Sequence, residues 1–214
     1  MSPFPQHLID GYRTFTSQRL PTEQSRYREL SERGQAPEVM VIGCCDSRVS
    51  PEVIFDAGPG ELFVVRNVAN LVPVYQPDGG AHGVSAALEY AVNALRVKHI
   101  VVLGHAQCGG IRAFIDNTAP LSPGDFIGRW MSMFVKPGEK VEQREHETMD
   151  DFTVRIEKAA VFRSLENLMT FPFVKTQVAG GKLDLHGAYF GVAEGSLFVL
   201  DREAKEFRGV QESE

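Results

Sequence analysis

Two short segments of the chain carry residues that could bind a metal ion. The first is CCDSR at residues 44–48, and the second is HAQCGG at residues 105–110. His105 and Cys108 lie three residues apart, so both can reach one ion, and a cysteine from the first segment completes a set of two thiolates and one imidazole. This donor set favours zinc over magnesium or calcium. Three protein ligands leave a coordination position open, which is typical of a catalytic zinc site.

The order of residues in the first segment indicates which of its two cysteines is the ligand. Side chains along an extended segment point alternately to opposite faces, so Cys44, Asp46 and Arg48 share one face and Cys45 points away from it. Asp46 and Arg48 then bring a charged pair next to the ion, and polar groups around a bound zinc ion orient its ligands. We therefore predict that Cys44 binds the metal and that Cys45 is a buried small hydrophobic residue on the far face.

Strands and helices alternate around these two segments. Residues 39–43, 61–67 and 99–105 are continuous apolar runs rich in β-branched residues, which predicts strands buried on both faces. A helical pattern occupies residues 81–95, and another helix begins after Gly104. This order predicts an α/β fold with a mostly parallel central sheet flanked by helices. Both metal-binding segments follow strands directly, so they should meet at the carboxyl edge of the sheet.

The N-terminal residues have the pattern of two weakly amphipathic helices. In the first, apolar residues recur at spacings of three and four over residues 4–15. A second helix is expected to begin after Pro21, with Thr22 as N-cap, and to end at Gly34. Both helices have few apolar residues, so they should lie on the surface or against a partner subunit.

The C-terminal half should complete the same domain. Residues 121–150 are polar and are expected to leave the core, a long helix is expected over residues 149–169, and two closing strands over residues 183–192 and 196–201. We predict a single domain with three parts: a helical arm at 1–34, an α/β core at 35–202 and a C-terminal tail at 203–214.

Composition limits the classes of partner and compartment. The 214 residues carry a formal net charge of −6, which disfavours nucleic acid and anionic membranes as partners. No apolar run approaches the roughly 20 residues that a membrane-spanning helix needs. Three cysteines do not make a disulfide scaffold, and the first residues do not have the pattern of a secretion signal, so we expect a cytoplasmic protein.

At the two metal-binding segments the chain resembles the β-class carbonic anhydrases, and its plant-like bacterial subgroup in particular. That family carries C-x-D-S-R after one strand and H-x-x-C-G after another, and the likeness covers most of residues 34–115. The resemblance implies one zinc ion per chain, a helical arm that packs on a partner subunit, and a homodimer or higher even-numbered oligomer. It also implies the reversible hydration of carbon dioxide to bicarbonate and a proton, by attack of hydroxide held on zinc.

The resemblance also assigns roles to residues that would otherwise be interpreted as core or loop. Gln35 matches the residue that donates a hydrogen bond to bicarbonate. Phe63, Val68 and Tyr90 match apolar residues that line the carbon dioxide pocket at the dimer interface, and Gly109 matches a backbone position beside the metal.

Asp46 and Arg48 are the expected catalytic pair. Asp46, held ionised by Arg48, can accept a hydrogen bond from the attacking hydroxide and orient it toward carbon dioxide. In a closed state Asp46 could instead bind the zinc ion. Val41 stands where a subgroup regulated by bicarbonate has tryptophan, which favours an accessible metal.

Two other functions are compatible with the same residues. One is a zinc domain without activity that binds bicarbonate as a sensor. The other is hydrolysis of carbonyl sulfide or carbon disulfide, which close relatives of the family perform.

Overall fold

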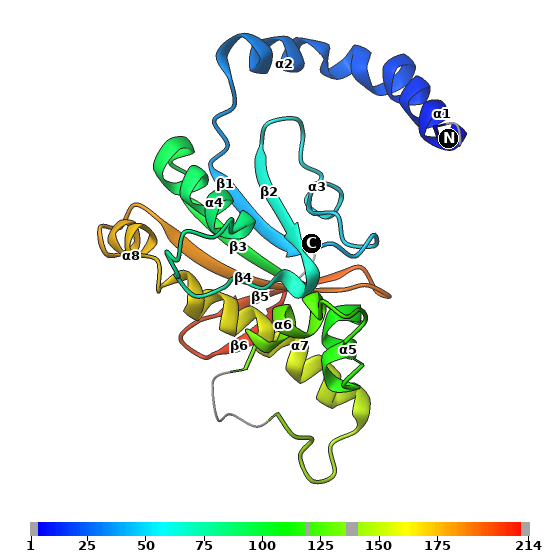
Figure 1. Cartoon of the computed structure of the whole chain (residues 1–214). Coiled ribbons are helices and arrows are strands. Elements are labelled where there is room, and N and C mark those ends of the chain that lie inside the picture. Colours follow the sequence, from blue (N-terminus) through cyan, green and yellow to red (C-terminus); the bar gives the residue numbers. More distant parts are fainter. Residues whose placement is uncertain (1–3, 119, 136–140, 211–214) are drawn as a thin grey trace.

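The computed structural model describes residues 4–118, 120–135 and 141–210, and its centre is a six-stranded sheet (Figure 1). The strand order is β2-β1-β3-β4-β5-β6, and the first four strands are parallel whereas β5 and β6 are antiparallel to their neighbours. The strands are β1 (Val39–Cys44), β2 (Leu62–Asn67), β3 (His99–His105), β4 (Asp184–Gly191), β5 (Ser196–Asp201) and β6 (Glu206–Gly209). The predicted α/β fold with a mostly parallel sheet is confirmed.

Helices occupy the crossovers, the N-terminal arm and one face of the sheet. Their bounds are α1 (Gln6–Thr14), α2 (Leu20–Arg33), α3 (Pro51–Ile54), α4 (Gly83–Glu89), α5 (Gly109–Ile115), α6 (Phe126–Ser132), α7 (Met149–Leu168) and α8 (Pro172–Ala179). Three short helical segments of other types are η1 (Phe15–Arg19), η2 (Val68–Asn70) and η3 (Tyr90–Leu95). No helix within the described residues combines the length and apolar character that crossing a membrane requires.

The main core lies between the sheet and the helices α4, α7 and α8. Met40 and Ile42 of β1 and Ile100 and Val102 of β3 are completely buried there. These positions alternate along their strands, so one face of the sheet packs on the helices. The opposite face forms a smaller cluster around Val41, Leu103 and Ala188, which packs against Ile54 of α3.

Helix α7 confirms the long helix expected over residues 149–169. It begins at the N-cap Thr148, whose hydroxyl accepts a hydrogen bond from the Asp151 amide at 3.1 Å. The polar stretch before it was expected to leave the core. Instead, the chain returns to the core at α6, because Met131 of α6 and Phe134 just after it are buried there. Residues 136–140 of that stretch lie outside the described residues.

The N-terminal arm projects away from the body of the molecule (Figure 1). The prediction of a second helix capped by Thr22 was wrong, because α1, η1 and α2 run without a break and the Thr22 hydroxyl donates to the Arg19 carbonyl at 2.7 Å. The wider π turn of η1 ends just before Pro21, and such a turn accommodates a residue that lacks an N–H group. No residue of α1, η1 or α2 is buried.

The C-terminal segment differs from the expected tail, because β6 pairs with β5 and extends the sheet to residue 209. This strand is short, and Glu206 and Arg208 alternate with Phe207, so its apolar signal is weak. Residues 211–214 of the predicted tail lie outside the described residues.

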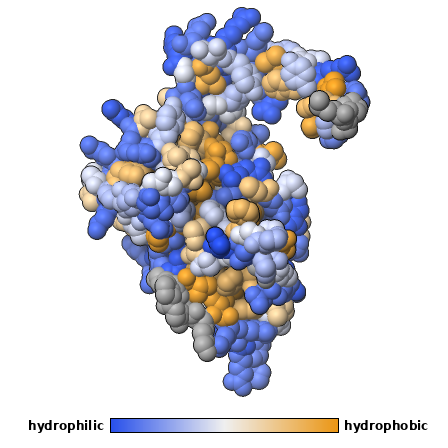
Figure 2. All heavy atoms as spheres, in the orientation of Figure 1, coloured by the Kyte–Doolittle hydropathy of each residue, from blue (hydrophilic) through white to orange (hydrophobic). Residues whose placement is uncertain are grey.

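Apolar side chains remain exposed on both the arm and the body. Figure 2 shows them on the arm and in patches on the body below it. On the arm, Phe4, Leu8 and Tyr12 are each at least half exposed, with values of 66%, 51% and 65%. Apolar side chains gathered on an exposed arm mark a candidate interaction surface.

Candidate metal centre

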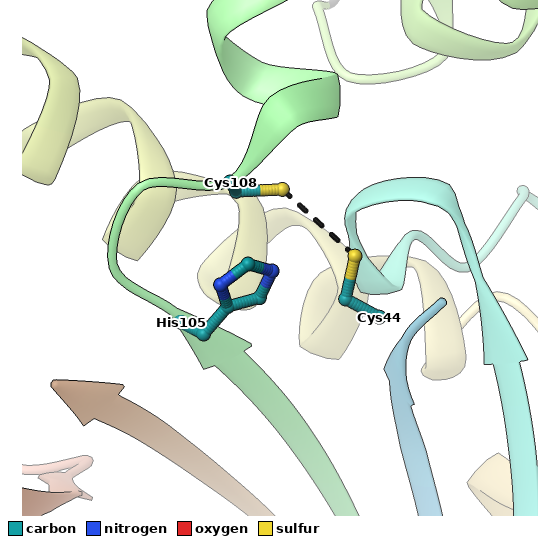
Figure 3. Close-up of side chains that lie close together, drawn as sticks. All are labelled: Cys44, His105 and Cys108. Carbon is teal, nitrogen blue, oxygen red and sulfur yellow. Dashed lines mark hydrogen bonds between the residues drawn. The ribbon is translucent and has the colours of Figure 1, made fainter. Parts of the chain in front are cut away.

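Three buried side chains meet at the carboxyl edge of the sheet (Figure 3). Cys44 ends β1, His105 ends β3, and Cys108 precedes α5. Their possible ligand atoms all lie within 4.8 Å of one another, and the two sulfur atoms are 4.0 Å apart. The three residues predicted to bind the metal are therefore brought together from positions 64 residues apart in the chain.

This arrangement fits a zinc ion. Two sulfurs bound to tetrahedral zinc at 2.3 Å lie about 3.8 Å from each other, close to the distance found here. His105 Nδ1 donates to the Ala106 carbonyl at 2.8 Å, which fixes the ring so that Nε2 carries the lone pair. That Nε2 atom is buried and has no hydrogen-bonding partner among the described residues. A metal ligand has this environment, whereas a structural histidine would have both nitrogens satisfied.

The environment of the cysteines favours a thiolate. A hydrogen bond from the Cys108 thiol and the neighbouring His105 ring lower the pKa of Cys44 to about 4, although burial opposes the shift. The same hydrogen bond raises the pKa of Cys108, because one sulfur of the pair gives up its proton before the other. Burial lowers the pKa of His105, but its interactions with Cys44 outweigh burial and raise it.

Asp46 and Arg48 form a bidentate ion pair beside the three ligands. Arg48 Nε donates to Asp46 Oδ1 at 2.9 Å and Arg48 Nη2 donates to Oδ2 at 2.7 Å. The Arg48 amide also donates to Oδ1, at 3.0 Å. These bonds hold the pKa of Asp46 well below its usual range, so the carboxylate is ionised. Both Asp46 oxygens are engaged by Arg48, the arrangement expected of an open site.

Arg48 also connects the two metal-binding segments. Its Nη2 donates to the Gln107 carbonyl at 2.9 Å, next to Cys108. Gln107 has a φ of +56°, a conformation that costs energy for residues other than glycine. The strained loop presents its carbonyl to Arg48, so the ion pair and the ligands form one unit.

Three residues that the sequence analysis missed support this unit. Glu157 of α7 is only 2% exposed, and its carboxylate accepts from the Cys108 amide at 2.8 Å and from the Tyr189 hydroxyl at 2.7 Å. Burial raises the pKa of Glu157 despite these bonds. Arg66 donates to the carbonyls of Cys44 and Asp46 at 2.7 and 2.6 Å. An acidic residue on the apolar face of α7 was the available sequence signal for Glu157.

The expectation that Cys45 is buried was wrong. It is exposed, because β1 ends at Cys44 and no layer covers the next residue. Cys45 lines an open, mostly apolar groove of about 920 Å³. The other residues along this groove are Asn67, Val68, Pro73, Ala81, His82, Gly83, Val84, Phe126, Ile127, Arg129, Trp130 and Met133.

The five residues assigned to substrate fall into two groups. Gly109 begins α5 beside Cys108, and Val68 packs against Gly110, where an added Cβ would lie 2.5 Å from the valine side chain. Gln35 and Phe63 instead lie toward the amino ends of β1 and β2, and the rings of Phe63 and Tyr90 are 5.9 Å apart.

The second group is distant from the ligands of its own chain. Phe63 pairs with Met40, four residues before Cys44 along β1, which corresponds to about 13 Å. Gln35 is farther still along the sequence, and Tyr90 is 50% exposed. One chain therefore does not bring Gln35, Phe63 and Tyr90 to its own metal site.

Comparisons with known proteins agree on one family. The sequence profile of the carbonic anhydrase family matches residues 39–197. Beta carbonic anhydrase 3 of Arabidopsis thaliana is 34% identical over 204 residues, which cover 94% of this chain and 78% of that protein. The structure of the β-carbonic anhydrase CcaA superposes with a TM-score of 0.86 at 28% identity, covering 97% of this chain and 92% of that one. A tetrameric β-carbonic anhydrase of Sordaria macrospora gives a TM-score of 0.76 at 27% identity, covering 96% and 98%.

Proposed function

The chain belongs to the β-class carbonic anhydrases, zinc enzymes that interconvert carbon dioxide and bicarbonate, and we propose which of its residues perform each part of that reaction. Cys44, His105 and Cys108 hold one zinc ion per chain. The observation that carries this assignment is the convergence of these buried ligand atoms within 4.8 Å. Zinc in such a site supplies the Lewis acidity that makes water a nucleophile near neutral pH.

Asp46 orients the attacking oxygen. Because Arg48 keeps its carboxylate ionised, Asp46 accepts a hydrogen bond from the nucleophile and directs an oxygen lone pair toward the carbon of carbon dioxide. A new C–O bond forms, one C=O electron pair moves to oxygen, and one proton of the water is released to solvent, so that carbon dioxide and water give bicarbonate and a proton. Arg48 keeps Asp46 in place while its bond to Gln107 maintains the position of the second ligand segment.

The substrate pocket is completed by a second copy of the chain. Val68 and Gly109 lie beside the metal ligands, whereas Gln35, Phe63 and Tyr90 lie too far away within one chain. In a twofold dimer the same surface occurs on both subunits, so each can supply these residues to the other. Apolar walls suit carbon dioxide, and the Gln35 amide can donate to bicarbonate.

The arm at residues 1–34 holds the dimer together by packing on the partner subunit. Its exposed apolar residues and the open groove beside Cys45 both support this assignment. The remaining described residues, to residue 210, form one α/β core. The tetrameric relative from Sordaria macrospora supports an even-numbered assembly of such dimers. The free cysteines and the exposed Cys45 are suited to a reducing compartment such as the cytoplasm.

The test combines zinc analysis with stopped-flow hydration of carbon dioxide. The wild-type protein should hold one zinc ion per chain and be active, and Cys108→Ser should lose both properties. Cys45→Ser, which alters the neighbouring exposed thiol, should keep both. A zinc-loaded protein without hydration activity would favour the bicarbonate sensor, and faster turnover of carbonyl sulfide or carbon disulfide than of carbon dioxide would favour that hydrolysis. The intact Asp46–Arg48 pair supports hydration over a sensor.

A further inference from the structure

A second group of metal-ligand side chains lies at the opposite, amino edge of the sheet. His99 begins β3, while Asp184 begins β4 and His186 follows two residues later. In the parallel register His99 pairs with Asp184, and Val101 pairs with His186. Paired residues of neighbouring strands point to the same face, and residues two apart along a strand do so as well. His99, Asp184 and His186 therefore project from one face of the sheet.

The three side chains converge. His186 Nε2 lies 3.2 Å from His99 Nδ1, and Asp184 Oδ2 lies 3.8 Å from the same His99 nitrogen. All three possible ligand atoms lie within 4.8 Å of one another. Two imidazole nitrogens bound to one tetrahedral zinc ion at 2.0–2.1 Å lie about 3.3 Å apart, so the two histidines already have the spacing of metal ligands. Asp184 is 71% exposed, and rotation of its side chain can shorten the longer distance.

A hydrogen bond between the histidines accounts for their 3.2 Å contact, but not for the approach of the Asp184 carboxylate to the same His99 nitrogen. Such a bond engages one proton and one lone pair, whereas His99 Nδ1 faces both a carboxylate and a second imidazole nitrogen. If Nδ1–H donates to Asp184, it cannot also donate to His186. A cation at the centre would instead accept a lone pair from each of the three residues.

We propose that His99, Asp184 and His186 form a second metal site, which binds a divalent transition metal ion such as Zn²⁺ from solvent. Two imidazoles and one carboxylate are donors that suit such ions, and they leave positions open for water. His99 is 40% exposed, so an ion can reach the site. The bound ion would tie the first residues of β3 and β4 together.

The charges around the site favour weak, reversible binding. Asp184 contributes the negative charge, whereas Glu38 is engaged by the Lys98 ammonium group. The Arg202 guanidinium, which donates to the Leu185 carbonyl at 3.5 Å, adds a positive charge near His186. A cation should therefore bind more weakly here than at the site with two thiolates.

The two sites are separate. Within one chain, His105 follows His99 by six positions, which corresponds to about 20 Å along β3. Occupation of the second site can therefore be measured independently of the first, and its loss should leave carbon dioxide hydration intact.

The experiment is equilibrium dialysis of the full-length protein against buffered Zn²⁺, with the bound zinc measured by mass spectrometry. Wild type should bind a second zinc ion per chain in addition to the tightly held one, and His99→Ala and His186→Ala should each lose only the weaker ion. His146→Ala removes a histidine that is 91% exposed outside the cluster and should keep both. If either cluster variant misfolds, His186→Gln provides a polar side chain without an imidazole and should also lose the second ion.

A second measurement assigns each bound ion to its site. Cys108→Ser should lose the tightly held zinc and keep the weaker ion, so a failure of the catalytic assignment and a failure of this one give different results. Co²⁺ bound to the second site should show no sulfur-to-metal charge-transfer band. The proposal is overturned if wild type binds only one zinc ion per chain throughout the titration, or if the His99→Ala/His186→Ala double variant still binds the second.

Discussion

At the scale of single residues, the bidentate contact between Arg48 and Asp46 can be tested by a conservative substitution. Arg48→Lys keeps the positive charge but loses the planar fork that binds both carboxylate oxygens and the Gln107 carbonyl. Substitution of a residue that holds the groups around a metal site typically costs about 10–100-fold in activity or metal affinity, so we expect a loss of kcat/KM in that range. Stopped-flow hydration of carbon dioxide measures it.

Arg112→Lys is the matched control, because the Arg112 side chain pairs with Asp116 at 2.7 Å, and its one bond to a ligand residue, from its amide to the Cys108 carbonyl, is kept in the variant. It should leave kcat/KM unchanged. If Arg48→Lys were as active as wild type with its zinc content intact, the orienting role of the pair would have to be abandoned.

Substitution of Glu157 tests whether its hydrogen bond with the Cys108 amide holds the second ligand segment in position. Glu157→Ala leaves the buried Cys108 amide without its acceptor, and an unsatisfied buried donor costs about 1–3 kcal/mol of unfolding free energy. We expect a loss of that size in urea denaturation, together with weaker zinc retention against a chelator. Tyr189→Phe removes only the other hydrogen bond to Glu157 and should retain zinc as wild type does. Equal zinc retention in Glu157→Ala and wild type would show that the amide contact does not position Cys108.

The sequence could predict some residues of the candidate site but not others. Cys44, His105 and Cys108 were predictable, because thiol and imidazole types at two strand ends leave few interpretations. Glu157 was not, since its partner is a backbone amide 49 residues away, and only the packing of α7 on β3 brings the two together. The burial of Cys45 was mispredicted for a related reason, because face alternation gives the direction of a side chain but not what covers it.

At the scale of elements, the contact between β3 and α7 positions both His105 and Glu157. Gly104 allows it, because an added Cβ would lie 2.6 Å from the Val161 side chain. Overpacking of a core costs about 1–3 kcal/mol, and we expect Gly104→Ala to lose unfolding free energy in that range. Val161→Ala in the same chain should restore part of it by making room, and thermal and urea denaturation measure both changes.

Gly83→Ala is the control for this substitution, since nothing lies within 4 Å of the added Cβ at that position. It should be close to neutral in stability. Additive losses in the Gly104→Ala/Val161→Ala double variant would contradict the steric explanation, because the two substitutions would then act independently.

Strands were more predictable than helix ends in this chain. β3 has the predicted bounds, since its continuous β-branched run has a clear beginning and end. The helix break expected at Pro21 does not occur, because the π turn η1 accommodates a proline that lacks a backbone N–H group. A π turn has no sequence signature of its own. β6 was missed because an edge strand with alternating charged residues resembles a polar tail.

At the scale of the whole molecule, the position of the residues proposed to bind substrate is the main argument for the proposed dimer. Gln35 and Tyr90 lie near the amino edge of the sheet, whereas Cys108 lies at the carboxyl edge of the same chain. Single-chain topology fixes this separation, and the proposed dimer would bring the two edges together. No pattern within one sequence shows which surface meets which, and for that reason these roles rested on the family resemblance.

Complementation between two defective chains tests the shared site directly. One chain carries Cys108→Ser and cannot hold zinc, and the other carries Gln35→Ala/Tyr90→Ala and lacks the pocket residues. Each homodimer should be nearly inactive. If the chains mix at random, half of the dimers contain one chain of each kind. In such a dimer, one of the two sites combines an intact metal centre with an intact pocket. Activity should therefore return to about one quarter of wild type. Stopped-flow hydration of the coexpressed, separately tagged chains measures the recovery.

A second mixture serves as the control and can contradict the shared site. A chain with all three substitutions, mixed with wild type, should give about one quarter of wild-type activity if sites are shared, because every mixed dimer then has no complete site. Sites contained within single chains would instead give about one half in this mixture and no recovery in the first. Only a dimer in which each chain completes the other's site gives the same value in both experiments, so the pair of measurements decides where Gln35 and Tyr90 act.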